Sequence, residues 1–194
     1  MIDAEETLPS VENLRPNLAV LFSAGGAVAL ISTLSLPLPI AIASSLLGAL
    51  MVAGAEVDAR TYLLPDTVTW GGITLGILAA PVLNPFEPWL SAGAAVVRAA
   101  GTALALVVLR WGYSWLRSRE GLGLGDVKLA AAVGAWLPVA FIPFCFALAT
   151  CSALVSVMFG RLRGESVDAA AKLPFGAFLC PALWLVFYTC ELPG

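Results

Sequence analysis

Long apolar runs with few charged residues recur along this chain, and they restrict its fold more than any other feature. A run of about twenty apolar residues is long enough to cross the roughly 30 Å hydrocarbon core of a bilayer as a helix. The whole sequence is 60% hydrophobic and only 12% charged, which is far from the composition of a soluble domain. We therefore expect an all-α, polytopic membrane protein built as a helical bundle.

Seven apolar segments are predicted to enter the membrane, which corresponds to about six to seven transmembrane segments. Turn residues such as proline, asparagine and glycine separate them. The fifth segment is too short to cross alone, so we expect either a half-length helix or a tilted helix that runs on past Pro138 with a kink. The predicted segments are residues 18–36, 37–57, 67–83, 89–111, 127–137, 139–159 and 174–190.

The basic residues indicate how these segments are oriented. The loops around Pro37, residues 84–88 and Pro138 contain no lysine or arginine, whereas the alternate loops are basic. The positive-inside rule places the basic loops in the cytoplasm. We therefore expect residues 1–17 to form a polar cytoplasmic N-terminus and residues 18–194 to form a single integral-membrane domain. The basic set comprises Arg15, Arg60, Arg110, Arg117, Arg119, Lys128, Arg161, Arg163 and Lys172.

One arginine, Arg98, lies inside a predicted span rather than in a loop. A charged side chain within a membrane segment usually pairs with another charge or with backbone carbonyl groups. Two interpretations follow: Arg98 bonds to carbonyl groups between helices, or it binds a carboxylate.

Two aspartates, Asp58 and Asp126, each lie at the junction of a polar loop and an apolar run. A carboxylate near lipid costs several kcal/mol, roughly 2.5 or more on insertion scales, so such residues are usually functional. Two predicted spans separate their loops, which therefore emerge on the same, cytoplasmic side. Carboxylates that converge can share a proton and activate water, as in an aspartic protease.

Structural explanations compete with this hypothesis. Asp126 follows glycines at alternate positions, and an ordinary N-cap on a glycine-rich loop would look similar. The loop lacks the lysine and hydroxyl of a phosphate-binding P-loop. Pro65 is expected to end the loop, and either Asp66 or Thr67 is expected to cap the third span.

The cations nearest the two acids are predicted to point elsewhere. Residues two apart on a helix lie about 200° around its axis, so Arg60 is poorly placed to neutralise Asp58, and Lys128 to neutralise Asp126. We expect both cations to reach lipid headgroups instead. The two acids would then be left for each other, for water or for a substrate.

The chain contains four cysteines and no histidine. No two cysteines show the spacing of metal ligands, and no histidine is present to complete a zinc site. We therefore expect no metal and no cofactor, and we expect the cysteines to be buried free thiols. They are Cys145, Cys151, Cys180 and Cys190.

Three ordered motifs lie on the predicted spans and their loops. They are Asp58-Ala59-Arg60-Thr61-Tyr62-Leu63-Leu64-Pro65-Asp66, Gly123-Leu124-Gly125-Asp126-Val127-Lys128-Leu129 and Leu173-Pro174-Phe175-Gly176. Together they resemble the type IV prepilin peptidases, the bacterial members of the GxGD intramembrane aspartic proteases. The resemblance runs from about Pro37 to the C-terminus. The family often continues the third motif with another proline, where this chain has Ala177.

The resemblance implies that Asp58 and Asp126 are the catalytic pair of a leader peptidase. It implies cleavage after a glycine in the short basic leader of prepilins or pseudopilins, at the cytoplasmic face of the bacterial inner membrane. Gly123 and Gly125 would shape the loop that presents Asp126. The implied partners are this substrate and the lipid bilayer, without nucleic acid, and the oligomeric state is not implied. Substrate-binding or supporting positions would be Arg60, Pro65, Asp66, Lys128, Pro174, Phe175 and Gly176.

One departure from the family concerns the N-terminal part. Many members carry a cytoplasmic domain with paired cysteines, which is linked to methylation of the new N-terminus. Here the first two predicted spans meet at Leu36-Pro37, on the outer side. The chain therefore looks like a shorter, peptidase-only member, of the kind that serves tight-adherence (Flp-type) pili, and we expect no methyltransferase activity.

Two other classes of function compete with this one. A non-enzymatic transporter subunit or pilus-assembly scaffold would also be apolar, but a transporter usually places acids near the bilayer midplane and shows repeated halves. Neither feature is evident in this sequence. The other alternative is a peptidase of the same group that acts on a different leader, such as an archaeal-type preflagellin.

Overall fold

The computed structural model describes residues 16–117, 123–163 and 174–192, and all regular elements in these ranges are helical. Five of the helices are long and apolar enough to cross a membrane, and α7 is a shorter apolar helix. The predicted fold class, a polytopic helical bundle, is therefore confirmed. The elements are α1 (Leu18–Ser35), α2 (Leu38–Thr61), α3 (Asp66–Leu83), α4 (Pro88–Arg117), α5 (Leu124–Trp136), the 3₁₀ turn η2 (Val139–Phe141), α6 (Ile142–Leu162) and α7 (Phe175–Cys190).

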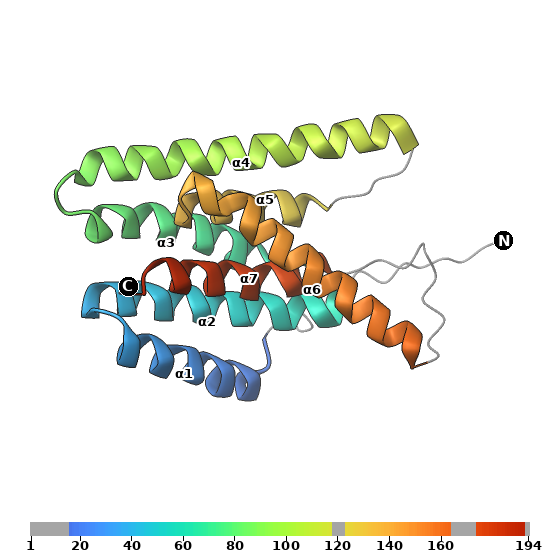
Figure 1. The fold of residues 1–194 in the computed structure, drawn as a ribbon, viewed down its shortest axis with the longest axis horizontal. Coiled ribbons are helices and arrows are strands. Elements are labelled where there is room, and N and C mark those ends of the chain that lie inside the picture. The colour runs from blue at the N-terminus through green and yellow to red at the C-terminus, as the bar shows by residue number, and fades with distance from the viewer. Residues whose placement is uncertain (1–15, 118–122, 164–173, 193–194) are drawn as a thin grey trace.

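Most helices lie side by side along the long axis of the molecule, and α6 crosses them obliquely (Figure 1). On one side α1 packs on α2, α2 packs on α7, and α7 packs on α6. On the other side α5 is enclosed by α3, α4 and α7. Small residues allow these close approaches. For example, Trp136 of α5 lies against Gly76 of α3. The Trp136 indole N–H also donates a hydrogen bond of 2.8 Å to the Gly72 carbonyl oxygen. The core therefore centres on α5 and α7.

The fifth predicted segment is a half-length helix. At about 1.5 Å per residue the 13 residues of α5 span roughly 20 Å, which is less than a bilayer core. Leu137, the residue before Pro138, has extended dihedral angles of φ −98° and ψ 144°. A proline disfavours the helical conformation in the residue before it. The alternative of a kinked helix that continues past Pro138 is therefore wrong, and the chain turns through η2 into α6.

Arg98 of α4 hydrogen-bonds to the C-terminal turn of α5, which ends inside the bundle. The Arg98 Nε–H donates to the Gly134 carbonyl oxygen at 3.2 Å. The last carbonyl groups of a helix have no partner within the helix, and a cation there also interacts favourably with the helix dipole. Of the two interpretations of Arg98, the bond to a carbonyl group between helices is the correct one.

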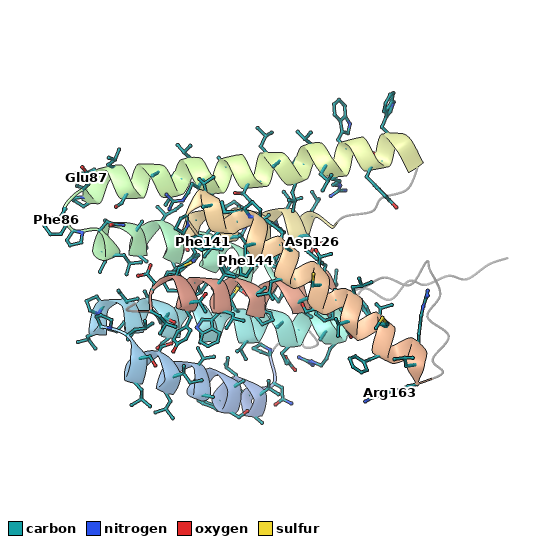
Figure 2. The ribbon with its side chains drawn as sticks, viewed as in Figure 1. Phe86, Glu87, Asp126, Phe141, Phe144 and Arg163 are labelled. Carbon is teal, nitrogen blue, oxygen red and sulfur yellow. The ribbon has the colours of Figure 1, made fainter. Side chains whose placement is uncertain are left out.

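The two ends of the bundle carry different side chains. Figure 2 shows Phe86 and Glu87 at one end, in the connection from α3 to α4, and Asp126 in the opposite half, toward Arg163. We call the end with Asp58 and Asp126 the aspartate end. There α4 and α6 extend beyond α2, α3, α5 and α7 (Figure 1).

The prediction that all four cysteines are buried is wrong for one of them. All four are free thiols, and Cys145 and Cys180 are buried, whereas Cys190 is half-buried and Cys151 is exposed on α6. Apolar residues of a membrane helix can face either the core or the lipid. The hydrophobicity of a segment therefore does not predict which of its cysteines are enclosed.

Candidate active site

A cavity of about 280 Å³ lies at the aspartate end. It collects residues from the end of α2, the start of α3, the start of α5 and the start of α7. The three sequence motifs, which are far apart along the chain, therefore meet at one place. The lining residues are Asp58, Tyr62, Leu63, Leu64, Asp66, Gly123, Leu124, Gly125, Asp126, Lys128, Pro174 and Phe175.

Asp58 lies in the last turn of α2, which continues to Thr61 rather than ending at residue 57 as predicted. Its side chain is buried, with the residue only 5% exposed. One carboxylate oxygen, Oδ2, accepts a hydrogen bond of 2.8 Å from the backbone N–H of Ala177. A carboxylate buried in this way needs such a donor, because an unpaired buried charge is very costly.

The start of α7 supplies that donor. The N-cap of α7 is Pro174, which has no side-chain oxygen to satisfy the first N–H groups of the helix. Asp58 fills this role from a different helix, at the end where the helix dipole favours a negative charge. Gly176 leaves the space, because a Cβ atom there would lie 2.9 Å from Oδ2 of Asp58.

Asp126 lies in the first turn of α5, three residues after the N-cap Gly123. Its Oδ2 accepts a hydrogen bond of 3.2 Å from the Gly123 N–H. Asp126 is therefore not the N-cap itself, although its side chain satisfies a backbone donor at the same helix start. Gly125 permits the first two motifs to approach closely, since a Cβ atom there would lie 3.2 Å from the Cβ of Leu64.

The two carboxyl groups are close enough to influence one another. Burial raises the pKa of the Asp126 carboxyl, the Gly123 N–H lowers it, and the charge of Asp58 raises it further. Cys180 of α7 lies within electrostatic reach of both acids. Two acids in this relation titrate as a pair and can hold one proton between them.

The neighbouring cations pair with other acids. Lys128 Nζ lies 2.5 Å from Asp66 Oδ1, which joins α5 to α3. Arg60 Nε lies 2.6 Å from Glu56 Oε1, one turn earlier on α2. The expectation that these cations reach lipid headgroups is therefore replaced by two ion pairs, because acids lie within reach of each side chain.

The predicted cap of α3 is also absent. The N-cap of α3 is Pro65, and no side chain hydrogen-bonds to the first N–H groups of the helix. Asp66 is the first helical residue, and its carboxylate turns to Lys128 instead. Asp66 is not placed to act as the N-cap, because it already lies inside the helix. Its carboxylate instead forms a charge-assisted bond with Lys128.

The sequence-predicted residues are mostly brought together. Eight of them line the cavity, and Gly176 packs against Asp58 just behind it. Pro65 ends the connection into α3, whereas Arg60 is occupied by Glu56 on α2. Leu173, Arg15, Arg119 and Lys172 lie outside the described residues. Where the structure describes the chain, no three His, Cys, Asp or Glu residues group so as to hold a metal ion.

Two features of the site have no signal in the sequence pattern. Tyr62, which follows α2 and lines the cavity, has a left-handed backbone with φ 56°. This conformation is uncommon for a residue other than glycine, and such strain often occurs at functional sites. Ala177 contributes only its backbone N–H, which no side-chain motif reveals. Two hints are its position directly after the Phe175-Gly176 motif and its departure from the proline that the family motif often has there, since proline has no N–H.

This chain is similar to known proteins over more than half of its length. Residues 45–158 match the type IV leader peptidase family. Leader peptidase HopD of Escherichia coli is 38% identical over 137 residues, which cover 71% of this chain and 86% of HopD.

Longer relatives match over a similar part of this chain. The prepilin leader peptidase/N-methyltransferase of Dickeya chrysanthemi is 37% identical over 144 residues, which cover 70% of this chain and 48% of that protein. That of Aeromonas salmonicida is 34% identical over 152 residues, with 74% and 48% covered. The chain thus spans about half the length of these relatives. No solved structure matches it.

Proposed function

This chain belongs to the type IV leader peptidase family, and we propose that it is a membrane aspartic endopeptidase that removes the leader peptide of type IV prepilins or pseudopilins. The observation that supports this most directly is that Asp58 and Asp126 line one cavity and interact electrostatically. A scaffold has no need for two partly buried acids in one cavity. A transporter would place such acids near the middle of the bundle, whereas these lie at the ends of α2 and α5.

In this proposal the pair hydrolyses one peptide bond without a cofactor. The ionised carboxylate takes a proton from a water molecule, whose oxygen bonds to the scissile carbonyl carbon, while the protonated carboxyl donates its proton to the carbonyl oxygen. In the second step the C–N bond breaks, the nitrogen takes the proton from the first acid, and the second acid regains its proton from a hydroxyl of the intermediate. An extended peptide must reach both acids, so the substrate helix must unwind near its leader junction.

We further propose that the site opens to the cytoplasm. Arg60, Lys128, Arg161 and Arg163 belong to segments at the aspartate end, whereas residues 84–88, at the other end, contain no lysine or arginine. The positive-inside rule favours the cytoplasm for the basic end. The leader would then be cut before the pilin leaves that face of the inner membrane.

We also propose that the chain cleaves without methylating, as a peptidase of the tight-adherence (Flp) type. Only Leu36 and Pro37 lie between α1 and α2, so no domain is inserted between these helices. This short connection favours peptidase activity alone.

Processing of a coexpressed Flp-type prepilin in a strain that lacks its own leader peptidase tests this proposal. We expect the wild type to produce mature pilin and both Asp58→Asn and Asp126→Asn to lose at least about 100-fold of the cleavage rate, since proton transfer typically contributes 10²–10⁴-fold. Immunoblotting follows the shift in pilin mass. Mass spectrometry of the mature pilin is expected to show a new N-terminus directly after the leader glycine, with an unmethylated amine.

Glu87→Gln is the matched control, because Glu87 is an exposed acid near a separate cavity at the other end of the bundle. It should process the prepilin at the wild-type rate. Full processing by either aspartate variant would exclude the paired-acid mechanism. A methylated product would exclude the peptidase-only assignment while leaving the cleavage mechanism intact.

A further inference from the structure

The two acids of the cavity are held by different backbone donors. Oδ2 of Asp58 accepts the Ala177 N–H at 2.8 Å, at the start of α7. Oδ2 of Asp126 accepts the Gly123 N–H at 3.2 Å, outside the first turn of its own helix. Hydrogen bonds to an ionised group are shorter and stronger than neutral ones. The shorter bond therefore marks Asp58 as the better-stabilised anion.

We propose that Ala177 is a positioning residue whose backbone N–H holds Asp58 as the ionised base, and thereby leaves Asp126 as the proton donor of the pair. This inference rests on the proposed function, and it assigns the two roles that a paired-acid mechanism leaves interchangeable. The side chain of Ala177 has no part in it.

Three features at the start of α7 support this assignment. The N-cap Pro174 provides no acceptor, so the free N–H groups of the first turn face Asp58. The helix dipole adds a positive potential at that end. Gly176 lets the carboxylate approach the backbone, since a Cβ atom there would crowd Oδ2. Burial of Asp58 opposes ionisation, and the backbone N–H groups of Ala177 and Gly176 offset part of that cost.

The other charged groups around Asp58 do not reverse the assignment. Lys128 of α5 and Asp66 of α3 neutralise each other, and on α2 itself Arg60 pairs with Glu56.

The remaining titratable neighbours among the described residues are Tyr62, which lines the same cavity, Cys180 of α7 and Asp126 of α5. A buried thiol stays neutral because burial disfavours its charged form. Burial and the charge of Asp58 both raise the pKa of Asp126. Burial opposes ionisation of both acids, so the shorter backbone hydrogen bond at Asp58 decides between them, and Asp126 is the acid that keeps its proton.

The Ala177→Pro variant removes this donor selectively. Position 177 lies in the first turn of α7, where N–H groups have no i−4 acceptor and proline is tolerated. The substitution also removes the hydrogen bond that the Ala177 N–H donates to the Pro174 carbonyl oxygen at 3.2 Å. The acidic limb of the pH profile of kcat/KM reports ionisation of the base in the free enzyme. We expect this limb to move up by about one pH unit, because the ionised carboxylate loses a hydrogen bond. At the pH of the wild-type midpoint, cleavage by the variant should be roughly ten-fold below the plateau of the same variant.

Ala177→Gly is the matched control, because it changes the side chain and keeps the N–H. Its acidic limb should coincide with that of the wild type. If Ala177→Pro does not purify as a folded protein, Gly176→Ala replaces it, since the added Cβ would push Oδ2 away from the donor. We expect Gly176→Ala to shift the limb in the same direction. A limb that stays in place in a folded Ala177→Pro, or in Gly176→Ala, would overturn the inference.

A second measurement needs no activity. In protein labelled with ¹³C-aspartate in nanodiscs, the remaining acid of each single-acid variant can be titrated by its carboxyl chemical shift. We expect Asp58 in the Asp126→Asn variant to titrate at lower pH than Asp126 in the Asp58→Asn variant. Addition of Ala177→Pro should raise the first value only, and the reverse order would refute the assignment. Full processing by the single-acid variants, in contrast, would refute the paired-acid mechanism on which this inference rests.

Discussion

At the scale of single residues, backbone N–H groups bind the two acids of the cavity, and the nearby cations bind other acids. Ala177 and Gly123 donate to Asp58 and Asp126, whereas Lys128 pairs with Asp66. A cation beside an acid holds it ionised and disfavours proton exchange, because an opposite charge within a few ångströms lowers the pKa. Neutral backbone donors orient the carboxyl groups with a smaller effect on their ability to exchange a proton.

The Lys128–Asp66 pair is expected to position the start of α5 rather than to stabilise the protein as a whole. Its side chains are 34% and 71% exposed, and exposed ion pairs contribute only about 0–1 kcal/mol to stability. Because Lys128 follows Asp126 by two residues, we expect Asp66→Asn and Lys128→Gln each to lower kcat/KM by a few-fold. A double-mutant cycle measures the coupling.

If the two side chains act only through each other, the double variant Asp66→Asn/Lys128→Gln should be no slower than either single variant. High salt should also reduce the difference between the wild type and the single variants, since salt screens exposed pairs. Losses that simply multiply in the double variant would show that each residue acts separately, for example on the substrate.

At the scale of helices, the sequence predicts the elements well but not how they meet. Apolar runs and turn residues are local signals, and they place the spans to within a few residues at most ends, although α4 runs on to Arg117. They also identify Asp58 and Asp126 as unusual. The contact of α7 with Asp58, and the bond from Arg98 to the end of α5, depend on three-dimensional packing. No local pattern encodes a donor that belongs to a distant backbone.

The packing of α5 against α4 requires a glycine at position 134. A Cβ atom at Gly134 would overlap the Arg98 carbonyl oxygen and the Thr102 hydroxyl. We expect Gly134→Ala to lower the free energy of unfolding by about 1–3 kcal/mol, because overpacking forces the two helices apart. Thermal unfolding in detergent measures the change.

Gly101→Ala is the matched control for this prediction. Gly101 lies on α4, and a Cβ atom there would meet nothing within 4 Å. It should leave stability unchanged or raise it slightly, since alanine favours a helix by about 0.5–1 kcal/mol over glycine. Equal melting temperatures for Gly134→Ala and Gly101→Ala would contradict the close packing of α4 on α5.

At the scale of the whole molecule, the site lies deeper than the ends of the longest helices. The 30 residues of α4 span about 45 Å, more than a bilayer core needs. At the aspartate end α4 and α6 extend beyond the four helices that line the cavity (Figure 1). Trp111 and Trp115 are exposed on the extended part of α4, as is typical of side chains at a membrane–water interface. We therefore expect the acids to lie deeper than these tryptophans, close to one face of the membrane.

Labelling of single cysteines tests which side that is. The background is the Cys151→Ser/Cys190→Ser variant. In it, Phe86→Cys marks the end opposite the acids, where Phe86 is 98% exposed. Arg163→Cys marks the aspartate end, where α6 ends. We expect a membrane-impermeant maleimide to label Phe86→Cys in intact spheroplasts, and to label Arg163→Cys only after permeabilisation, because the basic end is retained in the cytoplasm. The reverse pattern would place the two acids outside the cell, where they could not meet a prepilin before its export, and would remove the basis for a cytoplasmic site.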